Sequence, residues 1–188
     1  AQLRRRAALL AEVRSFFARR GVLEVDTPQL VNHAVTDRHL HSAEVRWPGS
    51  AAPAGFLHTS PEYAMKRLLA AGSEDIYQLC HVFRGGEQGA FHNAEFTLVE
   101  WYRRGWNLEA LMQEVDELLR CLLGTAAAAA SRRLSYEQTF VQFLGCNPLL
   151  DSDHVLADCA RARGSDAALV GGCERDELLD LLMAAYVG

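Results

Sequence analysis

The stretch FRGGEQGAFHNAEFTLVEWY, residues 83–102, says more about the fold than any other part of the chain. The residues just before it, 76–83, are rich in Ile, Tyr, Val and Phe and indicate a strand. Glycines at 85, 86 and 89 mark a loop, and residues 92–103 return as the partner strand. We therefore expect an antiparallel hairpin at the centre of the fold.

Alternation along the returning strand would place His92, Phe96, Glu100 and Tyr102 on one face. An imidazole, an aromatic ring, a carboxylate and a phenol together are unusual for a core face. They are typical of a cleft floor, where a ring stacks on a base and polar groups fix a substrate. The alternative is a half-exposed strand with scattered polar residues, and the pattern alone does not choose between the two.

Two charged residues lie close to this strand in the expected fold. Arg84, beside two glycines, has a guanidinium that can reach a phosphate with paired donors, although an ordinary glycine-rich turn with a solvated arginine would look the same. Glu62 follows Ser60 and Pro61 at an expected helix start. Its carboxylate can receive an ammonium group or simply stabilise the positive end of the helix.

Composition narrows the class of protein. The 188 residues are 49% hydrophobic and 23% charged, as in an ordinary globular chain, which excludes a disordered tail, a collagen-like fibre and a disulfide-stapled miniprotein. The net charge of −5 gives no support to a nucleic-acid partner. Five cysteines without a C-x-x-C pair, and no apolar run of membrane length, predict a cytoplasmic protein with reduced thiols and no membrane partner.

The rest of the chain divides into two parts. Periodic apolar residues predict helices over 3–20, 61–71 and 107–122, with a short strand at 22–25 and a loop with an edge hairpin over 32–55. Residues 125–131 contain five consecutive alanines and indicate a linker. Beyond it, shorter helices are expected over 136–144, 152–163 and 174–186. We therefore expect a core over 1–124, followed over 125–188 by a linker and a helical insertion.

Three segments, in order, resemble class II aminoacyl-tRNA synthetases. Residues 83–102 resemble motif 2 of that class in its lysyl form, residues 20–28 resemble motif 1, and the Thr-Ser-Pro-Glu run at 59–62 resembles the amino-acid-binding segment between them. The resemblance implies an α+β fold: an antiparallel sheet flanked by helices, as a partial core. Motif 1 of the class implies a homodimer.

Within the class, residues 34–37, 63–72 and 100–103 resemble most the elongation factor P–lysine ligases, relatives of lysyl-tRNA synthetases without an anticodon domain. The resemblance implies ATP-dependent activation of lysine or (R)-β-lysine, with Mg²⁺, and transfer to a lysine of elongation factor P, with tRNA not expected as acceptor. A lysyl-tRNA synthetase fragment and a catalytically silent binding module are the alternatives.

The resemblance also implies roles for individual residues. Arg84 would clamp the α-phosphate and act in catalysis. The nucleotide would further be bound by His92 and Asn93 near the outer phosphates and by Phe96 on adenine. The amino acid would be held by five residues: Ser60, Pro61, Glu62, Glu100 and Tyr102.

The chain departs from the family pattern at three places. Gly86 stands where the family has a nucleotide-binding glutamate, with Glu87 as the nearest substitute, and Ala90 stands where a basic residue is usual. Motif 3 is missing, because the Gly-Gly-Cys-Glu-Arg run at 171–175 lacks the strands that precede that motif and indicates a loop and helix start. We therefore expect the N-terminal part of a ligase core, with the Mg²⁺ ligands outside this chain and no metal site within it. His33, His39 and His41 are assigned to a variable loop.

Overall fold

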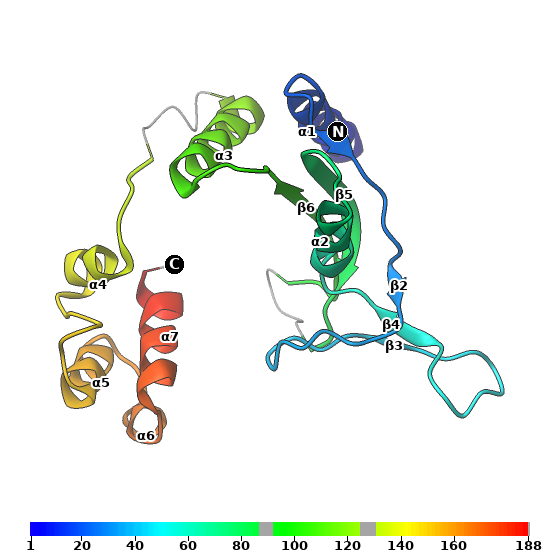
Figure 1. The fold of residues 1–188 in the computed structure, drawn as a ribbon. Coiled ribbons are helices and arrows are strands. Elements are labelled where there is room, and N and C mark those ends of the chain that lie inside the picture. The colour runs from blue at the N-terminus through cyan, green and yellow to red at the C-terminus, as the bar shows by residue number, and fades with distance from the viewer. Residues whose placement is uncertain (87–91, 125–130, 188) are drawn as a thin grey trace. The chain divides into compact units, whose positions relative to one another are not determined.

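The computed structural model describes residues 1–86, 92–124 and 131–187 (Figure 1). These residues form two compact units, 1–129 and 130–188, each with its own core. In the first unit the elements follow one another as α1 (Gln2–Ala18), β1 (Leu23–Glu24), β2 (Leu30–Val31), β3 (Glu44–Val45), β4 (Gly55–Leu57), α2 (Glu62–Ala70), β5 (Ile76–Phe83), β6 (Glu95–Tyr102) and α3 (Leu108–Leu123). The second unit contains α4 (Tyr136–Leu144), α5 (Asp153–Ala162), α6 (Ala167–Gly171) and α7 (Arg175–Tyr186).

The main sheet has the strand order β1–β5–β6. The pair β5–β6 is antiparallel over eight residues, from Ile76 opposite Tyr102 to Phe83 opposite Glu95, and β1 adds a short parallel pair. The predicted hairpin is therefore confirmed. A second, antiparallel sheet of order β2–β4–β3 folds the segment expected as loop and edge hairpin.

Helices α1 and α3 cover one face of the main sheet. Phe17 of α1 stacks on Tyr77 of β5 with ring centroids 4.5 Å apart, and lies 5.4 Å from the Trp101 ring of β6. Leu118 of α3 completes this core. Because Tyr77 and Trp101 are opposite each other in the ladder, their neighbours in sequence face the other way, which places Glu100 and Tyr102 on the face opposite α1 and α3.

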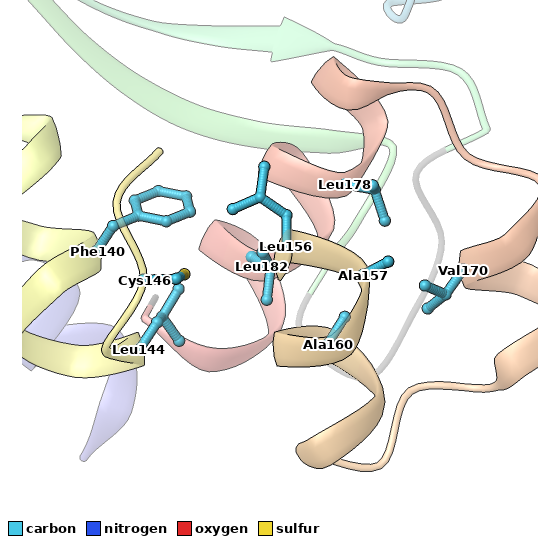
Figure 2. Packing of buried hydrophobic residues seen from close by; sticks show 9 residues of the cluster. All are labelled: Phe140, Leu144, Cys146, Leu156, Ala157, Ala160, Val170, Leu178 and Leu182. Atoms are coloured by element: carbon cyan, nitrogen blue, oxygen red, sulfur yellow. The ribbon is translucent and has the colours of Figure 1, made fainter. Parts of the chain in front are cut away.

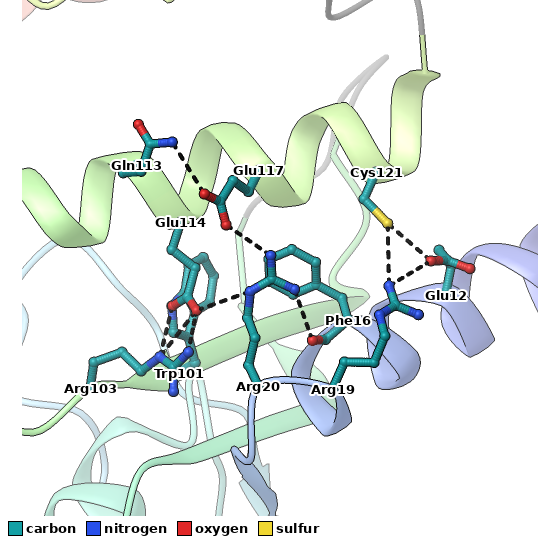
Figure 3. Close-up of polar contacts among 10 residues, drawn as sticks. All are labelled: Glu12, Phe16, Arg19, Arg20, Trp101, Arg103, Gln113, Glu114, Glu117 and Cys121. Carbon is teal, nitrogen blue, oxygen red and sulfur yellow. Dashed lines mark hydrogen bonds and ion pairs between the residues drawn. The ribbon is translucent and has the colours of Figure 1, made fainter.

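A buried ion cluster joins α3 to the sheet (Figure 3). Glu114 of α3, 2% exposed, accepts hydrogen bonds from Arg103 and from the Trp101 ring nitrogen, and Arg20 lies 3.8 Å away. Arg103 also donates to Asp75 at 3.0 Å. The helix that follows β6 is thus fixed by charge as well as by apolar packing.

The predicted helices of the second unit are confirmed, and α6 is an additional one. Their core is a set of nine buried residues, seen together in Figure 2: Phe140, Leu144, Cys146, Leu156, Ala157, Ala160, Val170, Leu178 and Leu182. The 171–175 run ends α6 and begins α7, as the loop-and-helix interpretation predicts. Arg175 there donates to Asp153 and to backbone carbonyls of the same unit.

Candidate functional site

Ser60 connects the start of α2 to the face of the main sheet opposite α1 and α3. Its hydroxyl accepts from the Glu62 backbone N–H at 3.0 Å and donates to Glu100 Oε2 at 2.6 Å. Pro61, buried beside it with φ −75°, occupies the cap position instead of the first helical position that the sequence predicts. The Ser-Pro-Glu run therefore brings Glu62 and Glu100, which are far apart in sequence, to the lining of one cavity.

Glu100 is held on both carboxylate oxygens. Oε2 accepts from Ser60, and Oε1 accepts from the Tyr102 hydroxyl. Burial raises the pKa of Tyr102 well above its ordinary value, and the hydrogen bond to Glu100 raises it further. Tyr102 therefore keeps its proton and donates a hydrogen bond to Glu100 at any physiological pH, which fixes the direction of the carboxylate.

Ser60, Glu62 and Glu100 border a cavity of about 560 Å³, whereas Pro61, Phe96 and Tyr102 are outside its lining. Its size suits a small substrate with part of a nucleotide. Carboxylates of Asp37, Glu62 and Glu100 lie along it together with the guanidinium-bearing Arg84. The remaining lining residues are Pro28, Val31, His33, Val35, Thr36, Leu40, Ser42, His58, Thr59, Ser60, Tyr63, Ala64 and Leu98. A cavity with acidic groups and one arginine can take a molecule that carries ammonium groups and an anionic part.

Glu62 already binds an ammonium group from its own helix. Lys66, the single lysine of the chain, lies one turn later and pairs with Glu62, which raises the pKa of Lys66. Both side chains are about half exposed. The pair demonstrates that the Glu62 carboxylate accepts an alkylammonium in this geometry, and that a substrate ammonium would have to share it with Lys66 or displace Lys66 from it.

Arg84 lies at the boundary between the cavity and Phe96. Its Nε donates to the Thr59 carbonyl at 3.3 Å, and its guanidinium carbon is 5.2 Å from the centroid of the Phe96 ring. The arginine is thus held within reach of the cavity, as a phosphate clamp requires. Phe96 shares a strand face with Glu100 and Tyr102, as the alternation predicts, and Arg84 lies over that ring.

His92 does not belong to this face, contrary to the prediction. Strand β6 begins at Glu95, so the alternation cannot be extended back to His92, and both His92 and Asn93 are exposed and outside the cavity lining. The reason lies in β5. After the bond from Arg84 N–H to the Ala94 carbonyl, Gly85 leaves the hairpin and pairs with His41 of the 32–42 segment.

The backbone after Arg84 explains why glycine occupies positions 85 and 86. A Cβ on Gly85 would lie 3.2 Å from the His41 carbonyl oxygen, and Gly86 has φ +81°, a conformation that L side chains rarely adopt. The family's glutamate at the position of Gly86 would therefore be strained in this backbone. Glu87 and Ala90 lie outside the described residues.

The sequence interpretation missed several residues that border the cavity. The hydroxyls of Thr36 and Tyr63 share a hydrogen bond of 2.7 Å, and Asp37 follows Thr36 in the sequence. His33, assigned to a variable loop, also lines the cavity, as does the buried His58. No periodicity marks this polar segment, so only the pairing of β2 with β4 brings it to α2.

The described residues contain no group of three or more His, Cys, Asp or Glu side chains arranged to hold a metal ion. Among these same residues, no helix has the length and apolar character needed to cross a bilayer.

The chain is similar to a known family of proteins and to several curated relatives. Residues 1–154 match the family model for class II tRNA synthetases (D, K and N). An elongation factor P–(R)-β-lysine ligase from Erwinia tasmaniensis is 48% identical over 190 residues, and one from Pseudoalteromonas translucida is 46% identical, each match covering 100% of this chain. A ligase of the same name from Vibrio vulnificus is 46% identical over 99% of the chain.

The chain spans 58% of the length of each of these relatives. The family match covers the main sheet, α2, α3 and every residue of the cavity. With its mainly antiparallel sheets flanked by helices, the chain belongs to the class II tRNA synthetases of the D, K and N type.

Proposed function

We propose that the protein containing this chain activates lysine or (R)-β-lysine with ATP and transfers the aminoacyl group to a lysine of elongation factor P. The observation that carries the proposal is the cavity in which Glu62 and the doubly held Glu100 lie within reach of Arg84. A diamino acid has two ammonium groups for two carboxylates, and one carboxylate of its own to direct toward a phosphate.

The proposed chemistry needs no protein nucleophile. An oxygen of the amino-acid carboxylate attacks the α-phosphorus of ATP, pyrophosphate leaves, and the acceptor amine then displaces AMP from the acyl carbon. Arg84 would stabilise the charge on the α-phosphate during the first step. Ser60, Pro61, Glu62, Glu100 and Tyr102 would orient the amino acid, which is a contribution from positioning.

For the nucleotide we propose that Phe96 stacks on adenine after Arg84 turns from the ring toward phosphate, and that His92 and Asn93 bind the outer phosphates. Mg²⁺ would accompany ATP. Cytoplasmic location, a homodimer through residues 20–28 and elongation factor P in place of tRNA belong to the same proposal. The names of the relatives support elongation factor P as the acceptor, and the resemblance of residues 20–28 to motif 1 supports the homodimer.

A catalytically silent binding module is the second candidate. Gly86 favours it, because its backbone conformation strains the glutamate that the family uses on the nucleotide. A lysyl-tRNA synthetase piece is the remaining enzymatic alternative. All three candidates keep the amino-acid pocket and differ in the chemistry after the amino acid has bound.

The test is amino-acid-dependent exchange of labelled pyrophosphate into ATP by the full-length gene product, with lysine and with (R)-β-lysine. We expect exchange in the parent and a loss of kcat/KM of about 100-fold in Glu100→Gln, the order found when one partner of a buried charge pair is removed. Glu95→Gln is the matched control, since Glu95 lies on the same strand but faces away and pairs with His81. Absence of exchange with correct amino-acid binding would leave the silent module.

A further inference from the structure

Gln78 is a buried amide at the middle of β5 that the proposed chemistry has not used. Its side chain is 1% exposed. Oε1 accepts a hydrogen bond from Thr27 Oγ1 at 2.9 Å, and Thr27 is itself buried. Within the described ranges, Nε2 has no hydrogen-bond partner. A buried donor without a partner is destabilising, so its retention calls for a physical reason.

The strand register places Gln78 directly opposite Glu100. Opposite residues of an antiparallel pair share a face, with Cβ atoms about 4.5–5.5 Å apart. Because the Gln78 amide oxygen accepts the hydrogen bond from Thr27, the two N–H donors on Nε2 remain available for another acceptor. The Glu100 carboxylate has about four acceptor positions, and Ser60 and Tyr102 use one on each oxygen. A donor without an acceptor therefore lies beside a carboxylate with unused acceptor capacity.

Cys80 is the other neighbour of this amide. Burial raises the pKa of the Cys80 thiol, hydrogen bonding of the Gln78 amide to the thiolate form opposes that rise, and the charge of Glu100 adds to it. The field of Glu100 is therefore felt on β5 next to Gln78. A neutral thiol is a weak acceptor and does not satisfy an amide donor as a carboxylate does.

We propose that Gln78 is a positioning residue of the amino-acid pocket: its amide donates to the Glu100 carboxylate when a substrate ammonium binds there, and Thr27 fixes which end of the amide faces Glu100. With Ser60, Tyr102 and Gln78 as donors, the remaining acceptor position of Glu100 is directed at the substrate. A reversed amide would present oxygen to the carboxylate and repel it, which gives the Thr27 hydrogen bond its role. The inference rests on the proposed function.

Steady-state exchange kinetics of the full-length protein test this role. In Gln78→Leu we expect the KM for the amino acid to rise about tenfold, as for the loss of one hydrogen bond to a charged group, while the KM for ATP stays unchanged. In Gln78→Glu, which has nearly the same shape, the rise should be larger at pH 8 and shrink as the pH falls, because two facing carboxyl groups share a proton more readily in acid. Cys80→Ala, on the same strand face, is the control and should leave both KM values unchanged.

Thr27→Val keeps the amide but removes the group that orients it, so it should raise the amino-acid KM less than Gln78→Leu does. If circular dichroism shows that Gln78→Leu is unfolded, the amino-acid KM of Thr27→Val tests the role of Gln78 instead. Folded Gln78→Leu and Gln78→Glu proteins with the parent's amino-acid KM and pH profile would overturn the proposal, as would equal rises in both KM values.

The two proposals fail in different ways. If the parent binds the amino acid by calorimetry but shows no exchange, the proposed reaction falls. The role of Gln78 is then decided by the Kd of the same variants, with the same expected order. If the parent binds no amino acid at all, both proposals fall.

Discussion

Each oxygen of the Glu100 carboxylate accepts one hydrogen bond, from the Ser60 hydroxyl before α2 and from the Tyr102 hydroxyl on the same strand. Each donor comes from a different part of the sequence, so the direction of Glu100 reports whether α2 is correctly placed on the sheet. At the scale of single residues, these two hydrogen bonds fix the direction in which Glu100 meets a substrate ammonium. Two hydroxyls add no charge, so Glu100 keeps its net negative charge and can still attract a cation.

Lys66 gives a prediction at the same scale. Replacing it by methionine removes the cation that pairs with Glu62, so we expect the amino-acid KM to fall by a factor of about 2–5, the worth of an exposed ion pair. Lys66 and Arg67 are both outside the cavity lining, but the ion pair with Glu62 is made by Lys66, so Arg67→Met is the control and should not change the KM. An increase in KM for Lys66→Met would show that Lys66 supports Glu62 instead of competing with the substrate.

Gly86 yields a second residue-scale prediction. Glutamate at this position, with φ +81°, should cost about 1–2 kcal/mol of folding free energy and should not lower the KM for ATP. Gly105→Glu is matched, because Gly105 has φ +73° with nothing near its Cβ. It should show a similar loss in denaturant unfolding. A lower ATP KM in Gly86→Glu alone would contradict the account, since it would mean that the backbone accepts the family's glutamate.

At the scale of elements, α3 is fixed to the sheet by Glu114. The carboxylate contacts Arg103 and Trp101 at the end of β6, and Arg20 just beyond α1. Figure 3 shows these side chains meeting at the helix. Since Arg103 follows Tyr102 directly, the anchor also fixes the strand end that carries the pocket.

Glu114→Gln should therefore destabilise the first unit by about 3–5 kcal/mol, the cost of breaking a buried charge pair. Glu117→Gln on the same helix is the control. Its ion pair with Arg20 is partly exposed, and we expect a loss below about 1 kcal/mol. Chemical denaturation followed by tryptophan fluorescence measures both. Equal losses would mean that burial of Glu114 does not determine its contribution.

Acid should loosen the contact between α1 and α3. Hydrogen bonds from Arg20 and Gln113 lower the pKa of Glu117, and those from Cys121 and Arg19 lower the pKa of Glu12, below the ordinary 4.5. A carboxyl whose folded pKa is depressed stabilises the fold above its unfolded pKa, and that contribution is lost as the pH falls through the folded value. The melting temperature should drop more steeply below pH 4.5 in the parent than in a Glu12→Gln, Glu117→Gln double variant. Parallel curves would refute this.

The sequence predicts long elements better than it predicts their junctions. Helix α3, with Asn107 as cap and Gly124 as end, follows from its periodicity, as does the β5–β6 pair. The start of β6 does not, because the pairing of Gly85 with His41 depends on a distant segment of the chain. The same holds for the pocket. Residues 34–37 and 63–72 are recognisable by their resemblance to the ligases, but the approach of Thr36 to Tyr63 depends on tertiary structure.

At the scale of the molecule, two units with separate cores imply that each can fold by itself. All nine buried residues of the second core lie within 130–188. We expect an isolated 130–188 peptide to be helical by circular dichroism and to melt cooperatively. Leu182→Asp should abolish this, because Leu182 is fully buried, whereas Leu150→Asp, at an 81% exposed position, should not. An unfolded wild-type peptide would contradict the independence of the unit.

The central claim concerns the acceptor as well as the pocket. The most direct measurement is mass spectrometry of elongation factor P after incubation with the full-length protein, ATP and (R)-β-lysine, with a matched reaction that offers lysine tRNA. The account predicts a gain of one β-lysyl residue on a lysine of elongation factor P, lost in Glu100→Gln and kept in Glu95→Gln. Charged tRNA with unmodified elongation factor P, or a product that survives Glu100→Gln, would contradict it.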